Sequence, residues 1–174
     1  SIIGAIPIAG TFVALALLPV STLCMMVGSA LTVQGERPGL PQIIQALKLD
    51  PERRNAFVTL GVFYALSFLV VLGFSALFDG GEFAKLNLMG GKISQEIVMQ
   101  PDFQRAMFAT MLLYVPLSML FWHAPGLIYW HRVPAIKAVF FSMIACVRNT
   151  RAFLMFGLAW MAVGIGFGIA FALT

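Results

Sequence analysis

His123 has the widest chemical repertoire of any residue within the apolar parts of this chain. An imidazole inside an apolar helix can ligate a haem or a metal ion, or it can hydrogen-bond to a neighbouring helix. The other histidine, His131, is eight residues further on, and a helical period of roughly 3.6 residues turns it away from the face of His123. Because no second ligand is evident, we interpret His123 as a hydrogen-bonding residue and expect no metal and no cofactor.

Catalytic motifs are missing from the polar segments, which hold no carboxylate pair, no Ser-His-Asp set and no phosphate-binding loop after a strand. The run at 164–168, Gly-Ile-Gly-Phe-Gly, is superficially like a nucleotide loop, but it lies in the middle of an apolar stretch. We therefore expect no catalytic residues and no enzyme activity. Small residues every four positions favour close packing of helices instead. The expected packing set is Gly164, Gly168 and Ala172, with Gly61 and Ala65 as favoured partners and another protein as the alternative.

The helices that carry these residues are predicted to cross a membrane. The chain has 174 residues, of which 60% are hydrophobic and 10% charged, and its mean hydropathy of +0.94 lies outside the usual range of soluble domains. Each long apolar run lacks Asp, Glu, Lys and Arg and exceeds the roughly 20 residues needed to span the hydrocarbon core. We predict one all-α transmembrane bundle over residues 1–174, with spans at about 2–33, 55–78, 106–130 and 152–173.

Local signals place the ends of some helices. Asp50-Pro51-Glu52 is typical of a helix start, with Asp as N-cap and Pro at the first helical position. Residues 41–48 and 134–148 are too short to span and are predicted to form interfacial helices. Kinks or local breaks are expected at the prolines inside the spans, which are Pro7, Pro19, Pro116 and Pro125.

The loop charges predict an orientation. The loops at 34–54 and 131–151 are rich in Lys and Arg, which favours the cytoplasmic side, whereas acidic residues balance the loop at 79–105, which is expected in the periplasm. A net charge of +4 spread between apolar runs suits lipid head groups and excludes a nucleic-acid surface.

Some basic residues could also bind a ligand. They would hold an anionic lipid head group or dock the acidic loop of a partner, although setting topology is their simplest role. The candidates are Arg53, Arg54, Arg132, Lys137, Arg148 and Arg151.

Several segments carry a resemblance to a known family. These are Arg37–Pro41, Phe121–Leu127, Pro134–Ser142 and Cys146–Asn149. The chain resembles a family of small polytopic inner-membrane proteins of proteobacteria that has no assigned biochemical role. The resemblance implies a bacterial inner membrane and a helical bundle, and it transfers no functional residues.

Two function classes remain open. The first is a non-catalytic accessory subunit or assembly factor of a larger inner-membrane complex, with membrane lipids and other integral membrane proteins as partners. The second is a transporter or channel-like protein for a hydrophobic or lipid-like solute, for which the prolines inside the spans could supply broken helices. The lack of reactive groups makes an intramembrane enzyme the weakest reading.

Overall fold

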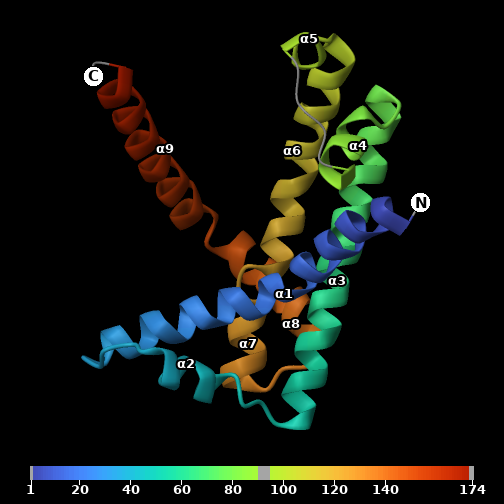
Figure 1. Cartoon of the computed structure of the whole chain (residues 1–174). Coiled ribbons are helices and arrows are strands. Elements are labelled where there is room, and N and C mark those ends of the chain that lie inside the picture. The colour runs from blue at the N-terminus through green and yellow to red at the C-terminus, as the bar shows by residue number, and fades with distance from the viewer. Residues whose placement is uncertain (1, 90–94, 173–174) are drawn as a thin grey trace.

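The computed structural model describes residues 2–89 and 95–172, and every regular element within those ranges is an α-helix. This confirms the predicted all-α class. The helices in chain order are α1 (Ile2–Val33), α2 (Leu40–Ala46), α3 (Pro51–Asp79), α4 (Glu82–Met89), α5 (Gln95–Val98), α6 (Pro101–Phe121), α7 (Ala124–His131), α8 (Ala135–Arg148) and α9 (Thr150–Ala172), as Figure 1 shows.

Four helical stretches are long and apolar enough to cross a membrane. They are Gly10–Val33, Pro51–Asp79, Pro101–His131 and Thr150–Phe171, and they coincide with the four predicted apolar runs. The last three begin a few residues before their predicted starts at 55, 106 and 152. The reason is that the first helical turn has free N–H groups and accepts polar residues. Leu173, at the end of the fourth predicted span, lies outside the described residues.

The start of α3 follows the predicted capping pattern. Asp50 has an extended backbone, and its Oδ1 accepts a hydrogen bond from the N–H of Arg53 at 2.9 Å. Pro51 occupies the first helical position, where its missing N–H costs no hydrogen bond. The prediction of a capped helix start at Asp50 is therefore confirmed.

The prolines inside the predicted spans differ in their effect on the continuity of the helices. The first span was predicted to have a kink or a local break; the structure contradicts the break, because α1 runs without interruption through Pro7 and Pro19, and the kink stays a prediction. Pro116 lies inside the continuous helix α6, whereas the helix is interrupted at Trp122 and His123, just before Pro125. Pro125 has no N–H to donate to the carbonyl of Phe121, four residues before it, so a helical hydrogen bond is missing across this interruption.

The interruption is closed by a side chain from α8. The hydroxyl of Ser142 accepts a hydrogen bond from the N–H of His123 at 2.9 Å and donates one to the carbonyl of Met119 at 2.7 Å. Met119 and His123 are four residues apart, which is the spacing of a backbone hydrogen bond in an α-helix. The hydroxyl thus occupies the place of that missing helical bond.

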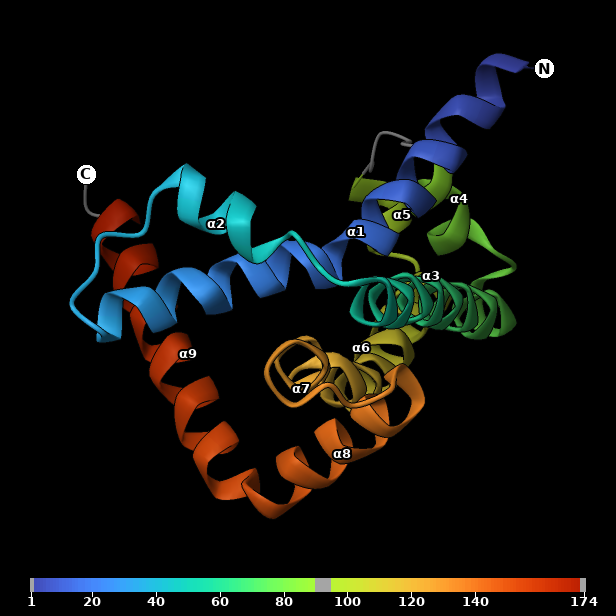
Figure 2. The same cartoon turned by 90° about the horizontal axis from the view of Figure 1, so that it is seen from below.

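The helices pack around a core in which α1, α3, α6, α7 and α8 meet. Figure 1 shows α1 crossing α3 obliquely, and α3 runs alongside α6. In Figure 2 the pair α3 and α7 is seen nearly end-on, with α8 running from beneath α7 toward the base of α9. The buried residues of this core are Leu23, Val27, Phe57, Leu60, Phe121, Ala124, Ile128, Ala135 and Ala138.

The helix α8 packs differently from a simple interfacial helix. Its inward face carries the small residues Ala135, Ala138, Ser142 and Cys146, which are buried against α6 and α7. Its outward face is apolar as well, with Phe140 and Ile136 strongly exposed. An interfacial helix presents a charged face to water. The segment 134–148 packs against the bundle through one face and has charges only toward its ends, and its position at the membrane interface stays a prediction.

Candidate functional site

A network of charged side chains joins the start of α3 to the end of α7. Arg53 donates from Nε to Asp50 Oδ2 at 2.9 Å and from Nη1 to the carbonyl of Tyr129 at 3.1 Å. Its guanidinium lies 5.6 Å from the centre of the Tyr129 ring, within cation–π range. Arg132 Nη2 lies 3.6 Å from the same Asp50 oxygen. The loops around residues 50 and 132 therefore lie at the same end of the protein.

Asp50 is the anion of this network. The hydrogen bond from the backbone N–H of Arg53 lowers the pKa of Asp50 below its usual value, desolvation opposes that shift, and the two guanidinium groups add to it. The carboxylate stays ionised at neutral pH. It therefore fixes Arg53 in place and draws Arg132 toward α3.

Arg132 has an unusual backbone. It caps α7 in the left-handed conformation, with φ of 53°, and its N–H bonds to the carbonyl of Leu127. Glycine is the favoured residue at such a cap because it has no Cβ. An arginine here carries a local strain, and its side chain remains 64% exposed.

A cavity of about 310 Å³ lies beside this network, between the start of α3 and the turn from α7 to α8. Its apolar wall includes Ala56, Ile128 and Ala135, and its polar groups are those of Glu52, Arg53, Asn55, Thr59 and Arg132. The sequence carries two separate signals here, the N-cap at Asp50 and the basic residue Arg132, but it gives no sign that the two meet. The cavity itself depends on α8 folding back beside α3, which no local motif indicates.

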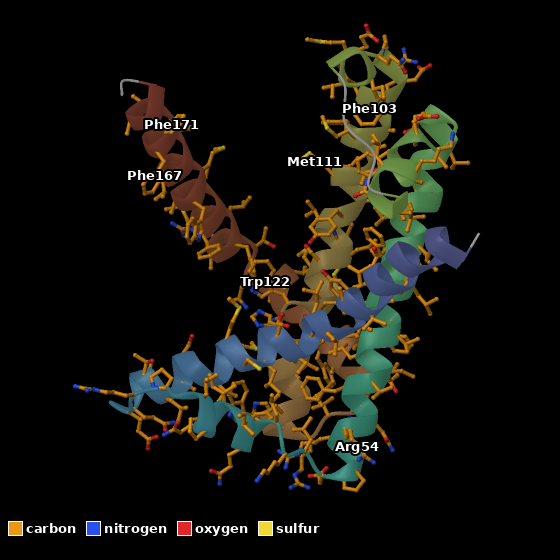
Figure 3. The ribbon with its side chains drawn as sticks, viewed as in Figure 1. Arg54, Phe103, Met111, Trp122, Phe167 and Phe171 are labelled. Atoms are coloured by element: carbon orange, nitrogen blue, oxygen red, sulfur yellow. The ribbon has the colours of Figure 1, made fainter. Side chains whose placement is uncertain are left out.

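The six basic candidates do not form one surface. Arg53 and Arg132 meet at Asp50, and Arg54 is exposed at the start of α3 (Figure 3). Arg148 and Arg151 lie at the junction of α8 and α9. The 14 residues of α8 cover about 20 Å, so this junction is far from the Asp50 network. Lys137 is exposed near the start of α8. The structure therefore divides these residues between separate surfaces, and their binding of a lipid head group or of a partner stays a prediction.

The predicted packing of the glycine stripe on Gly61 is wrong. Gly61 is buried against α1, where an added Cβ would collide with the carbonyl oxygen of Ala16. Ala65, one turn on, is half-buried in α3. Around Gly164 and Gly168 there are no other atoms within 4 Å of an added Cβ, so their face is open. The side chain of Ala172 lies outside the described residues.

The helix α9 stands apart from the bundle. The first residues of α9 contact the interruption between α6 and α7. The centre of the Phe153 ring lies 5.4 Å from that of Trp122 and 5.9 Å from that of His123. From Leu154 to Phe171 every residue is exposed. Figure 3 shows Phe167 and Phe171 on this separate helix, away from α6, which carries Phe103 and Met111.

A second cavity, of about 250 Å³, lies between α1, α3 and α6. Its wall is mostly apolar, with Leu15, Leu18 and Phe68 among its residues, and the side chains of Tyr64 and Tyr114 also line it. Ser67 and Ser118 also line it, but each donates its hydroxyl to a carbonyl of its own helix. Sequence reasoning missed this groove because none of its residues belongs to a motif.

His123 contacts both α8 and α9. Its ring packs edge-on to Phe153, and its backbone N–H bonds to Ser142. Within 2–89 and 95–172 there is no group of three or more His, Cys, Asp or Glu residues arranged to hold a metal ion. The hydrogen bond that His123 makes to another helix comes from its backbone, whereas we expected one from the imidazole.

Comparison with known proteins agrees with the membrane architecture. The chain is 33% identical over 179 aligned positions to a probable inner membrane protein of Burkholderia thailandensis. The alignment covers 97% of this chain and 64% of the relative, so the chain spans less than two thirds of that protein's length. No protein-family model and no solved structure matches. The four apolar helices and this similarity together identify the chain as a multi-pass inner-membrane protein that resembles the Burkholderia protein.

Proposed function

We propose that this protein is a non-catalytic accessory subunit or assembly factor of a larger inner-membrane complex, and that α9 packs against a transmembrane helix of its partner. The supporting observation is that α9 has no buried residue from Leu154 to Phe171, although α3, α6 and α8 all bury part of their surface.

The composition of α9 favours a protein partner on one of its faces. Lipid tails are as apolar as leucine, so helices associate in a membrane through close backbone approach, which small residues allow. Gly157, Gly164 and Gly168 fall within about 40° of one another around the helix axis, because each residue advances by about 100°. An added Cβ at any of them would meet nothing within 4 Å. This face can accept a second backbone.

The test compares two glycine faces of the same helix. In Gly164→Ile/Gly168→Ile, bulky side chains fill the proposed contact, while Gly166→Ile places the same side chain on the opposite face. Each protein is tagged, extracted from native membranes in mild detergent and separated by blue-native electrophoresis with identification of co-purifying proteins. We expect a larger assembly with the unaltered chain and with the Gly166 variant. We expect the lone protein with the double variant.

Two results would contradict the proposal. One is that the unaltered chain migrates alone, or only with copies of itself. The other is that both glycine faces tolerate isoleucine equally. Thermal unfolding in detergent provides the folding control, because isoleucine at these open positions should leave the bundle intact.

We also propose that the loops at 34–54 and 131–151 face the cytoplasm and the loop at 79–105 the periplasm. The support is the excess of basic residues in the first two loops. In a chain with Cys24→Ala and Cys146→Ser, a membrane-impermeant maleimide applied to intact spheroplasts should label Asn87→Cys. It should label Gln42→Cys only after the membrane is opened, and the reverse pattern would overturn this orientation.

A second candidate function is the binding or transfer of a hydrophobic solute. The observation that favours it is the groove at Tyr64 and Tyr114. Leu18→Trp would fill the groove, with Val13→Trp, exposed on the same helix, as its matched control. If the groove functions, only Leu18→Trp should abolish co-purification of an apolar molecule extracted into organic solvent. An extract without any such molecule from the unaltered chain would exclude this function.

A further inference from the structure

We propose that the cavity between the start of α3 and the turn from α7 to α8 binds the head group of a phosphoethanolamine phospholipid. In this arrangement Arg132 and Asn55 hold the phosphate, and Glu52 accepts the ammonium group. The inference is independent of any partner at α9, because the cavity and α9 involve separate residues.

The shape of the cavity suits an amphipathic ligand. Its volume of about 310 Å³ is at the lower end of the range for small-molecule sites, roughly 300 to 1,000 Å³. The charged groups of Glu52 and Arg132 share this cavity with the apolar side chains of Ile128, Val133 and Ile136. A lipid can satisfy both parts at once, with its head group on the charges and its glycerol and first methylenes on the apolar wall.

Arg132 is the cation that is available to a ligand. The guanidinium of Arg53 is already committed through Nε to Asp50 and through Nη1 to the Tyr129 carbonyl. Among the residues that the structure describes, the side chain of Arg132 pairs with Asp50 at the longer distance of 3.6 Å and with no other side chain, and most of it is exposed. Its planar set of N–H donors matches the geometry of a phosphate. The amide of Asn55, exposed one turn into α3, is a further donor at the same cavity.

Glu52 decides the class of head group. It lines the cavity, and among the described residues no side chain pairs with it. An anionic head group without an amine would place its phosphate on Arg132 but would leave the carboxylate of Glu52 beside a second negative charge without a cationic partner. A phosphoethanolamine head group carries a primary ammonium that can donate to Glu52 while its phosphate stays on Arg132. The pair of opposite charges therefore favours a zwitterionic lipid over an anionic one.

The simpler interpretation gives each charge a separate role. Glu52 in the first turn of α3 complements the positive end of the helix dipole, and Arg132 sets the topology. That interpretation predicts no preference among lipids, and no loss of such a preference on neutralising Glu52. The two interpretations therefore differ in a measurable quantity.

The experiment measures lipid retention by the whole protein. The purified chain is exchanged into detergent micelles containing equal amounts of phosphatidylethanolamine and phosphatidylglycerol with the same acyl chains, and lipid adducts are counted by native mass spectrometry. We expect phosphatidylethanolamine to be retained in about tenfold excess, the size of one charge-assisted hydrogen bond.

Four variants locate the site. Arg132→Gln should reduce retention of both lipids by about tenfold, whereas Arg54→Gln, on the neighbouring surface outside the cavity, should behave as the unaltered chain. Glu52→Gln should reduce the preference for phosphatidylethanolamine to near unity. Glu36→Gln, an exposed carboxylate of the preceding loop, should keep that preference. Thermal unfolding of each variant confirms that a loss of lipid does not come from a loss of fold.

The proposal is overturned if phosphatidylglycerol is retained as well as phosphatidylethanolamine by the unaltered chain. It is equally overturned if Glu52→Gln keeps the full preference, or if Arg54→Gln loses lipid to the same extent as Arg132→Gln.

Replacing phosphatidylethanolamine with phosphatidylcholine provides a last check. The quaternary ammonium of phosphatidylcholine cannot donate a hydrogen bond, so its retention should be several-fold weaker.

Discussion

The hydroxyl of Ser142 on α8 accepts the backbone N–H of His123 at 2.9 Å, where the helix through α6 and α7 is interrupted. The same hydroxyl donates to the carbonyl of Met119 at 2.7 Å, and Cys146, one turn further along α8, also contacts that carbonyl. In a membrane an unpaired backbone group has no water to bond with. The buried hydroxyl of Ser142 therefore satisfies both backbone groups at the interruption. It also connects α8 to the helix through α6 and α7.

Removing this hydroxyl should destabilise the fold. Ser142→Ala leaves the N–H of His123 and the carbonyl of Met119 without their bridge, which costs about 1 to 3 kcal/mol for a buried unsatisfied group. Unfolding in mixed detergent micelles, followed by circular dichroism, measures the loss. The matched control is Ser118→Ala, since that hydroxyl only bonds to Val115 of its own helix. Equal stability of the two variants would refute the bridging role.

The crossing of α1 and α3 depends on Gly61. An added Cβ would collide with the backbone oxygen of Ala16, so Gly61→Ala should push the helices apart and destabilise the protein by about 1 to 3 kcal/mol. Gly73→Ala is the control on the same helix, where a Cβ meets nothing within 4 Å. It should be neutral or stabilising by up to about 1 kcal/mol, because alanine is the better helix former. The same unfolding assay distinguishes the two.

Acid should weaken the end of the bundle at Asp50. The pKa of Asp50 is lowered in the folded state, so its contribution to stability is complete above its unfolded pKa of about 3.9 and is lost as the pH falls through the lower folded value. Melting temperatures from pH 6 to pH 2.5 should therefore fall more steeply for the unaltered chain than for Asp50→Asn, which keeps a capping side chain. Glu36→Gln should retain the steep fall, and parallel curves for all three would contradict the role of Asp50.

Two substitutions of Arg132 should differ in stability but not in lipid retention. Its left-handed φ of 53° favours glycine, and its ion pair with Asp50 is exposed and weak. Arg132→Gly should therefore be about 1 kcal/mol more stable than Arg132→Ala, which keeps the strained Cβ. Both variants should lose phospholipid to the same extent. If lipid retention instead followed stability, the side chain of Arg132 would have no binding role.

The sequence by itself determined the helices and their approximate ends. The apolar runs contain no charged residue over lengths that span a bilayer, and backbone groups in lipid must bond within their own helix. Asp50 and Pro51 fixed the start of α3 because a cap acts between residues three positions apart. These features involve only neighbours along the chain. Composition and local spacing are therefore enough to predict them.

The tertiary structure alone decided which faces meet. A soluble helix marks its buried face with an apolar stripe, but a membrane helix is apolar all round, so hydropathy does not distinguish the packed face from the one in lipid. Gly61 and Gly164 look equivalent in sequence, yet Gly61 contacts α1 and Gly164 faces open space. Ser142 is likewise one serine among several until α8 brings it, 19 residues along the chain, to His123. Contacts of this kind depend on shape complementarity between segments that are distant in the sequence. A local sequence pattern does not predict that complementarity.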